Sequence, residues 1–104
     1  MRREQVWTLV RGGGLYRVLV ISSDEYNRVD VIPAWALTVL RDVPRKEQPS
    51  FRLGPDDPLP GAYVRIPSVY QVLDRTALRE NHGFVSHVTM NAVESALRGF
   101  LELP

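Results

Sequence analysis

The chain has 104 residues, of which 44% are hydrophobic and 24% charged, and this balance fits one globular domain spanning residues 1–104. It contains no cysteine, which excludes disulfides and thiolate metal sites, and its net charge of +1 is far from that of a bulk nucleic-acid binder. The start of the chain has no apolar signal region, and no apolar run is long enough to span a bilayer, so we expect a cytoplasmic protein without membrane contact.

The first third of the chain alternates apolar segments with turns. Gln5–Val10 predicts a first strand, and Arg11–Gly14 predicts a turn because glycine accepts positive φ at no steric cost. Leu15–Ser22 follows as an almost unbroken apolar run, which is typical of a strand covered on both faces. Ser22–Asn27 predicts a loop or one helical turn, and Val29–Ala34 predicts a third apolar strand that ends near its proline.

The middle of the chain is rich in proline. Leu37–Leu40 predicts a short strand or a turn, and Arg41–Gly61, which contains five prolines, predicts a long surface loop. Within that loop a short strand is expected near Ser50–Leu53. Ala62–Ile66 and Val69–Leu73 predict two strands interrupted by the proline between them.

The last third of the chain ends in a predicted helix. Asp74–Arg79 predicts one helical turn, and Gly83–Ser86 predicts a last short strand. Apolar residues then recur with helical spacing, with Thr89 as the expected N-cap. The stripe consists of Val93, Ala96, Leu97, Phe100 and Leu101. These elements predict a mainly β fold, a small barrel or half-open sheet with one C-terminal helix packed on it.

One charge, Arg17, lies near the entrance of the most apolar strand. A charged group there is costly to bury unless it lies at a rim or has a partner. Two interpretations are open: a guanidinium at the mouth of the barrel that grips a phosphate together with Arg11 across the turn, or an edge arginine whose head reaches water. Tyr16 either faces the same site or packs in the barrel.

Aromatic and histidine side chains supply the remaining candidates. Trp35 could stack on a nucleotide base, or it could belong to the core or to a dimer surface. His82 and His87 are the only histidines, and their spacing matches no metal-binding motif. No other cluster indicates a metal or an organic cofactor, so we expect none.

Several blocks of sequence occur in an order that resembles one protein family. They are V-L-V-I-S-S-D-E-Y-N-R at Val18–Arg28, V-I-P at Val31–Pro33, V-L-D-R-T-A-L at Val72–Leu78 and A-V-E-S-A-L-R-G-F-L at Ala92–Leu101. Together with the first strand and its glycine-rich loop, this order resembles the MazF/PemK toxins of bacterial toxin–antitoxin pairs over nearly the whole chain. The Tyr16-Arg17 pair before the apolar strand is similar to the related gyrase-poisoning toxin CcdB.

The resemblance implies an SH3-like β-barrel of the CcdB/MazF type with a C-terminal helix, a homodimer, and neutralisation by a cognate antitoxin that is acidic and partly disordered. The MazF branch implies a metal-independent endoribonuclease that cleaves single-stranded RNA without a cofactor. The CcdB branch implies a toxin that binds a protein target such as DNA gyrase, and a catalytically silent dimeric binding domain is a third alternative. Of these, RNA cleavage is the function we expect.

The resemblance also suggests roles for individual residues. The Arg-Pro dipeptide of the MazF family falls at Tyr16-Arg17, and its catalytic threonine falls at Trp35. As catalytic residues, Arg17 would stabilise charge on the phosphorane oxygens and Tyr16 would supply a hydroxyl. The substrate-binding candidates are Arg11 for the RNA backbone, Ser22 and Ser23 for hydroxyl contacts, and Trp35 for stacking on a flanking base.

Overall fold

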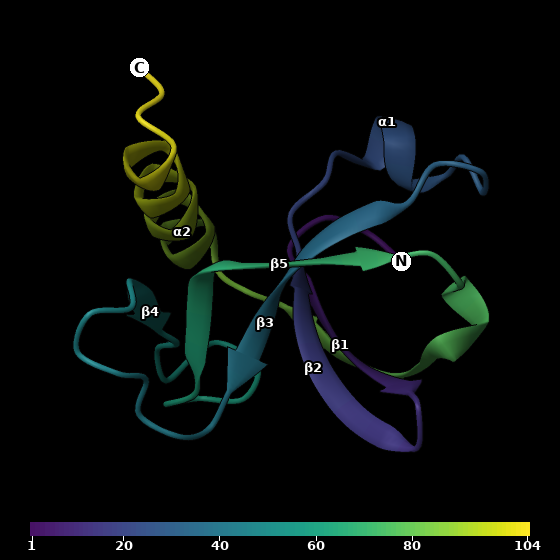
Figure 1. The fold of residues 1–104 in the computed structure, drawn as a ribbon, viewed down its shortest axis with the longest axis horizontal. Helices are drawn as coiled ribbons and strands as arrows, with labels where there is room; N and C mark the ends of the chain where they lie inside the picture. Colours follow the sequence, from purple (N-terminus) through teal and green to yellow (C-terminus); the bar gives the residue numbers. More distant parts are fainter.

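The computed structural model describes residues 1–104 and shows a mainly β protein that ends in one long helix (Figure 1). Neither helix has the length and apolarity that crossing a lipid bilayer requires. The elements in chain order are β1 (Gln5–Arg11), β2 (Gly14–Val20), α1 (Asp24–Asn27), β3 (Ala34–Leu40), β4 (Ser50–Arg52), β5 (Tyr63–Val72), the 3-10 turn η1 (Arg75–Ala77), β6 (Leu78–Phe84) and α2 (His87–Phe100).

The six strands form one antiparallel sheet in the order β4-β5-β3-β2-β1-β6. Strands β4 and β6 lie at the two edges and do not pair with each other, so the sheet curls without closing. Figure 1 shows α2 at the upper left and α1 at the upper right, with the green part of β5 running below both. The prediction of a mainly β fold with a C-terminal helix is confirmed.

Buried side chains cover both faces of the central strands. On one face Leu19 and Leu37 are fully buried in the larger cluster, which Met90 and Val93 of α2 cover. The smaller cluster consists of Leu9, Val18, Ala34, Ala36 and Val72. Because neighbouring residues of a strand point to opposite faces, the apolar run in β2 supplies both clusters, as predicted.

Most elements predicted from local patterns are confirmed. Strands β1, β2 and β4, the turns α1 and η1, and helix α2 are all present, and the predicted strand ends differ from the observed ones by one or two residues. The helical stripe is only partly used, because Val93 is buried whereas Phe100 and Leu101 are exposed.

Three strand predictions are wrong. Val29–Pro33 forms turns and bends, and β3 begins at Ala34 and absorbs the predicted segment Leu37–Leu40. The last strand is β6 rather than Gly83–Ser86. Its sequence is largely polar, and its pairing with β1 holds it in the sheet. The two strands predicted around the proline are one strand, β5.

Arg75 explains why the apolar segment after α1 is not a strand. Its guanidinium donates hydrogen bonds to the backbone carbonyl oxygens of Asn27, Asp30 and Ile32 at 2.8, 3.1 and 3.1 Å, and to that of Val29 at 3.3 Å. Turning these carbonyls toward one side chain requires a bent backbone, and the Ile32 N–H also donates to the Val29 oxygen in a turn, at 3.0 Å. This contact joins η1 to a loop more than forty residues away, so no local pattern reveals it.

Strand β5 contains a bulge opposite Thr38. Leu37 pairs with Val69 and Val39 pairs with Val64, so the single residue Thr38 faces the four residues 65–68. Pro67 lies in this bulge and has no N–H to offer the ladder. The bulge is where Figure 1 shows β5 bending sharply between its teal and green parts.

The start of α2 is held by a buried carboxylate. Ser86, rather than the predicted Thr89, is the N-cap, and its side chain accepts a hydrogen bond from the Thr89 N–H. Asp57 accepts hydrogen bonds from the Ser86 N–H, the Gly54 N–H and the Thr89 hydroxyl at 2.8, 2.8 and 2.6 Å. Burial by itself raises the pKa of Asp57, but these hydrogen bonds outweigh it and hold the pKa below its usual value.

We predict that Asp57→Ala lowers the free energy of unfolding by about 2–4 kcal/mol, because it leaves the three donors without an acceptor. Urea denaturation at neutral pH measures the change. Since the folded pKa is depressed, the contribution of Asp57 is fully present above the unfolded carboxyl pKa and is lost as the pH falls through the folded value. The stability difference between wild type and variant should therefore shrink in acid, and a constant difference would contradict the assignment.

Candidate active site

A cavity of about 490 Å³ lies where β2 and β3 separate. The ladder between these strands ends at the pair Arg17–Val39, and residues beyond that pair form much of the wall. The lining residues are Leu15, Tyr16, Arg17, Thr38, Val39, Leu40, Arg41, Asp42, Arg65 and Ser68. Three arginines and one carboxylate therefore meet at this cavity, which favours an anionic ligand.

The bulge in β5 brings two hydroxyl groups together in the wall of the cavity. Thr38 donates a hydrogen bond to the Ser68 hydroxyl oxygen at 2.7 Å. Arg65 comes from the same bulge, and its guanidinium donates to the side-chain oxygen of Gln48 at 2.7 Å. Without the extra residues of the bulge, neither Arg65 nor Ser68 would lie opposite Thr38.

Arg17 lies at this cavity without a counterion. No carboxylate is within ion-pair distance of its guanidinium, and its Nε atom is buried without a hydrogen-bond partner. The Nε atom of Arg65 is also buried without a hydrogen-bond partner. Unpaired buried donors are costly for stability, and a ligand at the cavity would offset that cost for both arginines.

Tyr16 and Arg17 leave opposite faces of β2. Arg17 pairs with Val39 of the larger cluster, whereas Val18, one residue further, pairs with Thr38, so Tyr16 is on the same face as Thr38. The Tyr16 ring folds back over Gly14, where an added Cβ would lie 3.2 Å from the ring. Gly14 thus leaves room for the Tyr16 ring. Beyond the last pair of the ladder, Arg17–Val39, residues from both faces of β2 line the cavity.

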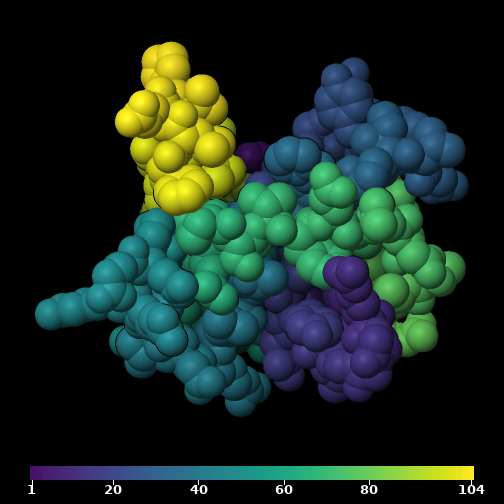
Figure 2. All heavy atoms as spheres, in the orientation of Figure 1, coloured from purple at the N-terminus to yellow at the C-terminus, as the bar shows by residue number.

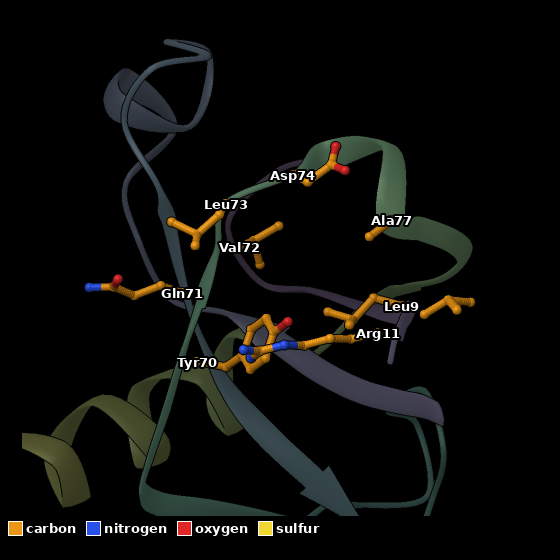
Figure 3. Close-up of a pocket in the computed structure, with 9 residues that line it drawn as sticks. Leu9, Arg11, Tyr70, Gln71, Val72, Leu73, Asp74 and Ala77 are labelled. Carbon is orange, nitrogen blue, oxygen red and sulfur yellow. The ribbon is translucent and has the colours of Figure 1, made fainter. Parts of the chain in front are cut away.

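Arg11 lies at a different cavity, of about 220 Å³, between β1 and the end of β5 (Figure 3). Figure 3 shows its guanidinium lying across the ring of Tyr70, and the distance to the ring centre is 5.4 Å. Asp74 lies at the far end of this cavity, and hydrogen bonds from the Thr76 hydroxyl and N–H lower its pKa. The structure therefore does not bring Arg11 and Arg17 together on one ligand.

The other predicted binding residues lie outside the Arg17 cavity. The Ser22 hydroxyl donates to the Asn27 side-chain oxygen and accepts from the Trp35 N–H, so it holds the loop before α1 against β3. Ser23 is exposed at the start of α1 without a side-chain cap hydrogen bond. Trp35 is 49% exposed on β3. No group of three or more metal-ligating side chains is present.

The sequence argument missed Thr38, Arg65 and Ser68. Thr38 lies three residues after Trp35, where the resemblance had placed the threonine of the family. Ser68 is thirty residues from Thr38, and a bulge inside one strand sets their contact. A proline within an otherwise strand-like segment was the available signal, because it marks an interrupted ladder.

We predict that Arg17→Met changes the free energy of unfolding by less than about 1 kcal/mol, since the side chain makes no ion pair and removing an unpaired buried donor offsets the lost packing. Urea denaturation at neutral pH measures this. A loss above about 2 kcal/mol would show that Arg17 is held for structure and not for a ligand.

Known structures resemble the whole chain. An endoribonuclease in complex with its cognate antitoxin from a mycobacterial species has 31% sequence identity and a TM-score of 0.85, covering 100% of this chain and 97% of that chain. A second mycobacterial endoribonuclease has 27% identity and a TM-score of 0.83, covering 100% and 93%. MazF in the MazE–MazF complex of Deinococcus radiodurans has the same fold, with 17% identity, a TM-score of 0.81 and coverage of 100% and 97%.

A scan of family models finds no match to the chain, and neither does a search of curated protein sequences. The likeness thus rests on structures, and the mycobacterial endoribonuclease at 31% identity covers every residue of the chain. The six-stranded sheet and the C-terminal helix agree with the mainly β fold that the sequence predicted. The chain belongs to the MazF-like toxins of toxin–antitoxin systems.

Proposed function

We propose that this protein is the toxin of a toxin–antitoxin pair and acts as a metal-independent endoribonuclease on single-stranded RNA. The observation that carries the proposal is the 490 Å³ cavity, where two arginines with unpartnered Nε atoms lie with a hydroxyl pair. Two mycobacterial structures that resemble the chain, at 31% and 27% identity, are endoribonucleases, which supports the same activity.

RNA carries its own nucleophile, the 2′-hydroxyl. Attack of this oxygen on the adjacent phosphorus forms the O2′–P bond and breaks the P–O5′ bond, leaving a cyclic phosphate and a 5′-hydroxyl. The 2′ proton leaves as the nucleophile attacks, and the departing 5′ oxygen takes up a proton. A protein accelerates this reaction by holding the groups in line and by stabilising charge on the phosphorane oxygens, and neither task requires a metal.

The cavity offers groups for both tasks. Arg17 and Arg65 carry guanidinium groups, which donate hydrogen bonds and accept none, so they stabilise negative charge and do not act as bases. The Ser68 oxygen accepts from Thr38, which leaves the Ser68 proton free for a phosphate oxygen. Tyr16 adds a third hydroxyl at the rim, so the proposed catalytic set is Arg17, Tyr16, Thr38, Arg65 and Ser68.

The other sequence candidates have separate roles in this proposal. Arg11, stacked on Tyr70, contacts the RNA backbone away from the scissile phosphate. Ser22 contributes by holding the loop before α1 against β3, and Ser23 is an exposed hydroxyl beside that loop. Trp35 presents its exposed ring to an RNA base or to a protein partner. Binding of DNA gyrase is the weaker alternative, because the structures that resemble the chain include RNA-cleaving enzymes.

An antitoxin fits the charge of the same cavity. One similar mycobacterial endoribonuclease is bound to its cognate antitoxin. We propose that the antitoxin of this protein presents an acidic, partly disordered segment to Arg17 and its neighbours, and so competes with RNA. Residues 1–104 act as one domain in this proposal, and cleavage of cellular RNA places the protein in the cytoplasm.

A homodimer would cover the apolar residues that α2 leaves open. Trp35, Val69 and Leu73 are 49%, 45% and 71% exposed, and the register of β3 with β5 places Trp35 and Val69 on the face where α2 packs. Figure 2 shows the hollow over this part of the molecule, between α2 in yellow and the α1 segment in blue, with green residues of β5 along its floor. Such an apolar strip on a small protein favours self-association.

Cleavage of a long single-stranded RNA in the presence of EDTA tests the proposed activity. We expect the wild type to yield discrete fragments that end in a cyclic phosphate. Arg17→Ala should lower the rate by about 10²–10³-fold, because it removes one charge aimed at the phosphorane. Thr38→Val should slow cleavage because it frees Ser68 from its hydrogen-bond partner.

Circular dichroism and thermal unfolding establish that the variants are folded, and Arg28→Ala, an exposed arginine on the C-terminal side of α1, is the matched control. Unchanged cleavage by Arg17→Ala would remove Arg17 from the mechanism. Absence of cleavage by the wild type on RNA of mixed sequence, together with inhibition of gyrase supercoiling, would replace the proposal by its alternative.

Light scattering tests the dimer. We expect a mass near twice 11.8 kDa at micromolar concentration, and a monomer for Trp35→Glu, because a charge in the apolar strip opposes burial. Val43→Glu, at a 78% exposed position in the loop after β3, should stay dimeric. A monomeric wild type, or a Trp35→Glu variant as dimeric as the control, would contradict this interface.

A further inference from the structure

A row of basic cavities leads from the candidate active site to the β4 edge of the sheet. Arg41 lines both the 490 Å³ cavity and a neighbouring cavity of about 500 Å³. Arg52 lines this second cavity and a third of about 560 Å³. The charged residues in the three walls are Arg17, Arg41, Arg52, Arg65 and Asp42. Positive charge therefore continues well beyond the place where we expect chemistry.

The Arg52 side chain lies against Tyr63 and Gly61. Its guanidinium carbon lies 5.9 Å from the centre of the Tyr63 ring. The same group lies across Gly61, where an added Cβ would be 3.6 Å from Nη2 and 3.9 Å from Nε. Neither Arg52 nor Arg41 takes part in an ion pair. A guanidinium fixed in this way is preorganised for a planar or tetrahedral anion.

We propose that Arg52 and Arg41 form a second phosphate subsite, which binds the backbone of the same RNA strand whose scissile phosphate lies at Arg17. The inference rests on the proposed function and extends it to the path of the substrate. A single strand carries one phosphate per nucleotide, so a strand that leaves the active-site cavity over Arg41 presents its next phosphates to Arg52. Tyr63, under the guanidinium, keeps that charge in place.

The lining of these cavities favours RNA over an acidic protein segment. Two of the six residues around the second cavity and one of the six around the third are hydrophobic. A peptide needs apolar pockets for its anchoring side chains, and these cavities offer few. A phosphate backbone needs only cations at intervals, which Arg41 and Arg52 supply.

Binding of an RNA that cannot be cleaved tests the subsite without requiring activity. The probe is a fluorescent 12-nucleotide pool of mixed sequence with every 2′-hydroxyl methylated, and its affinity is measured from about 0.05 to 1 M salt. We expect Arg52→Ala to reduce the dependence of log affinity on log salt by about 0.7, the value for one phosphate contact on a single strand. This slope corresponds to about eightfold weaker binding at 0.05 M salt and near equality at 1 M.

Arg28→Ala is the matched control, and it should bind like the wild type. In the cleavage assay Arg52→Ala should raise KM and leave kcat within about twofold, because Arg52 does not touch the reacting phosphate. If Arg52→Ala matches the control in affinity and salt dependence, the subsite is overturned even when the wild type cleaves RNA. Weakened antitoxin binding with unchanged RNA binding overturns it too.

If the wild type does not cleave RNA but the salt dependence still falls in Arg52→Ala, the subsite stands and the nuclease proposal fails. If the wild type binds no RNA at low salt, both are overturned. Thermal unfolding confirms that the exposed substitution leaves the fold intact, and Arg52→Lys, which keeps the charge, should recover most of the salt dependence.

Discussion

The missing N–H of one proline shapes both the sheet and its site. Pro67 cannot donate to the ladder with β3, and four residues of β5 bulge out opposite Thr38. The bulge divides β5 into one arm that pairs with β4 and another that continues along β3. The curvature that lets α2 cover the core and the contact of Ser68 with Thr38 both arise at this point. The shape of the sheet and the contact between Ser68 and Thr38 therefore depend on the same interruption of the ladder between β3 and β5.

Much of the fold could be predicted because its information is local. The apolar run of β2, the glycines before it and the helical spacing around Val93 each determine an element from neighbouring residues alone. The failures arise where a distant residue decides the structure. Val29–Pro33 has the composition of a strand, but Arg75 draws its carbonyls into a loop. Strand β6 is polar and exists because β1 offers it a partner.

The residues of the candidate site also divide into those that the local sequence reveals and those that depend on distant contacts. Arg17 could be found from sequence because a charge in an apolar strand is unusual, and the structure leaves it without a counterion. Thr38 and Ser68 could not be found, since polar residues of this size are common and only the bulge makes them neighbours. The resemblance placed the threonine position of the family at Trp35, whereas the threonine at the cavity is Thr38, which pairs with Val18 of β2.

Arg75 and Asp57 each hold a loop segment in place, and the two contacts differ in how they respond to acid. Arg75 donates hydrogen bonds to main-chain carbonyl oxygens, so no carboxylate takes part in that contact. Asp57 accepts hydrogen bonds at the start of α2 through a carboxylate that becomes protonated at low pH. Acid therefore weakens the hydrogen bonds at the start of α2, whereas those from Arg75 to the loop after α1 do not depend on a carboxylate. The position of α2 on the sheet is thus tied to pH through a single side chain in the loop after β4.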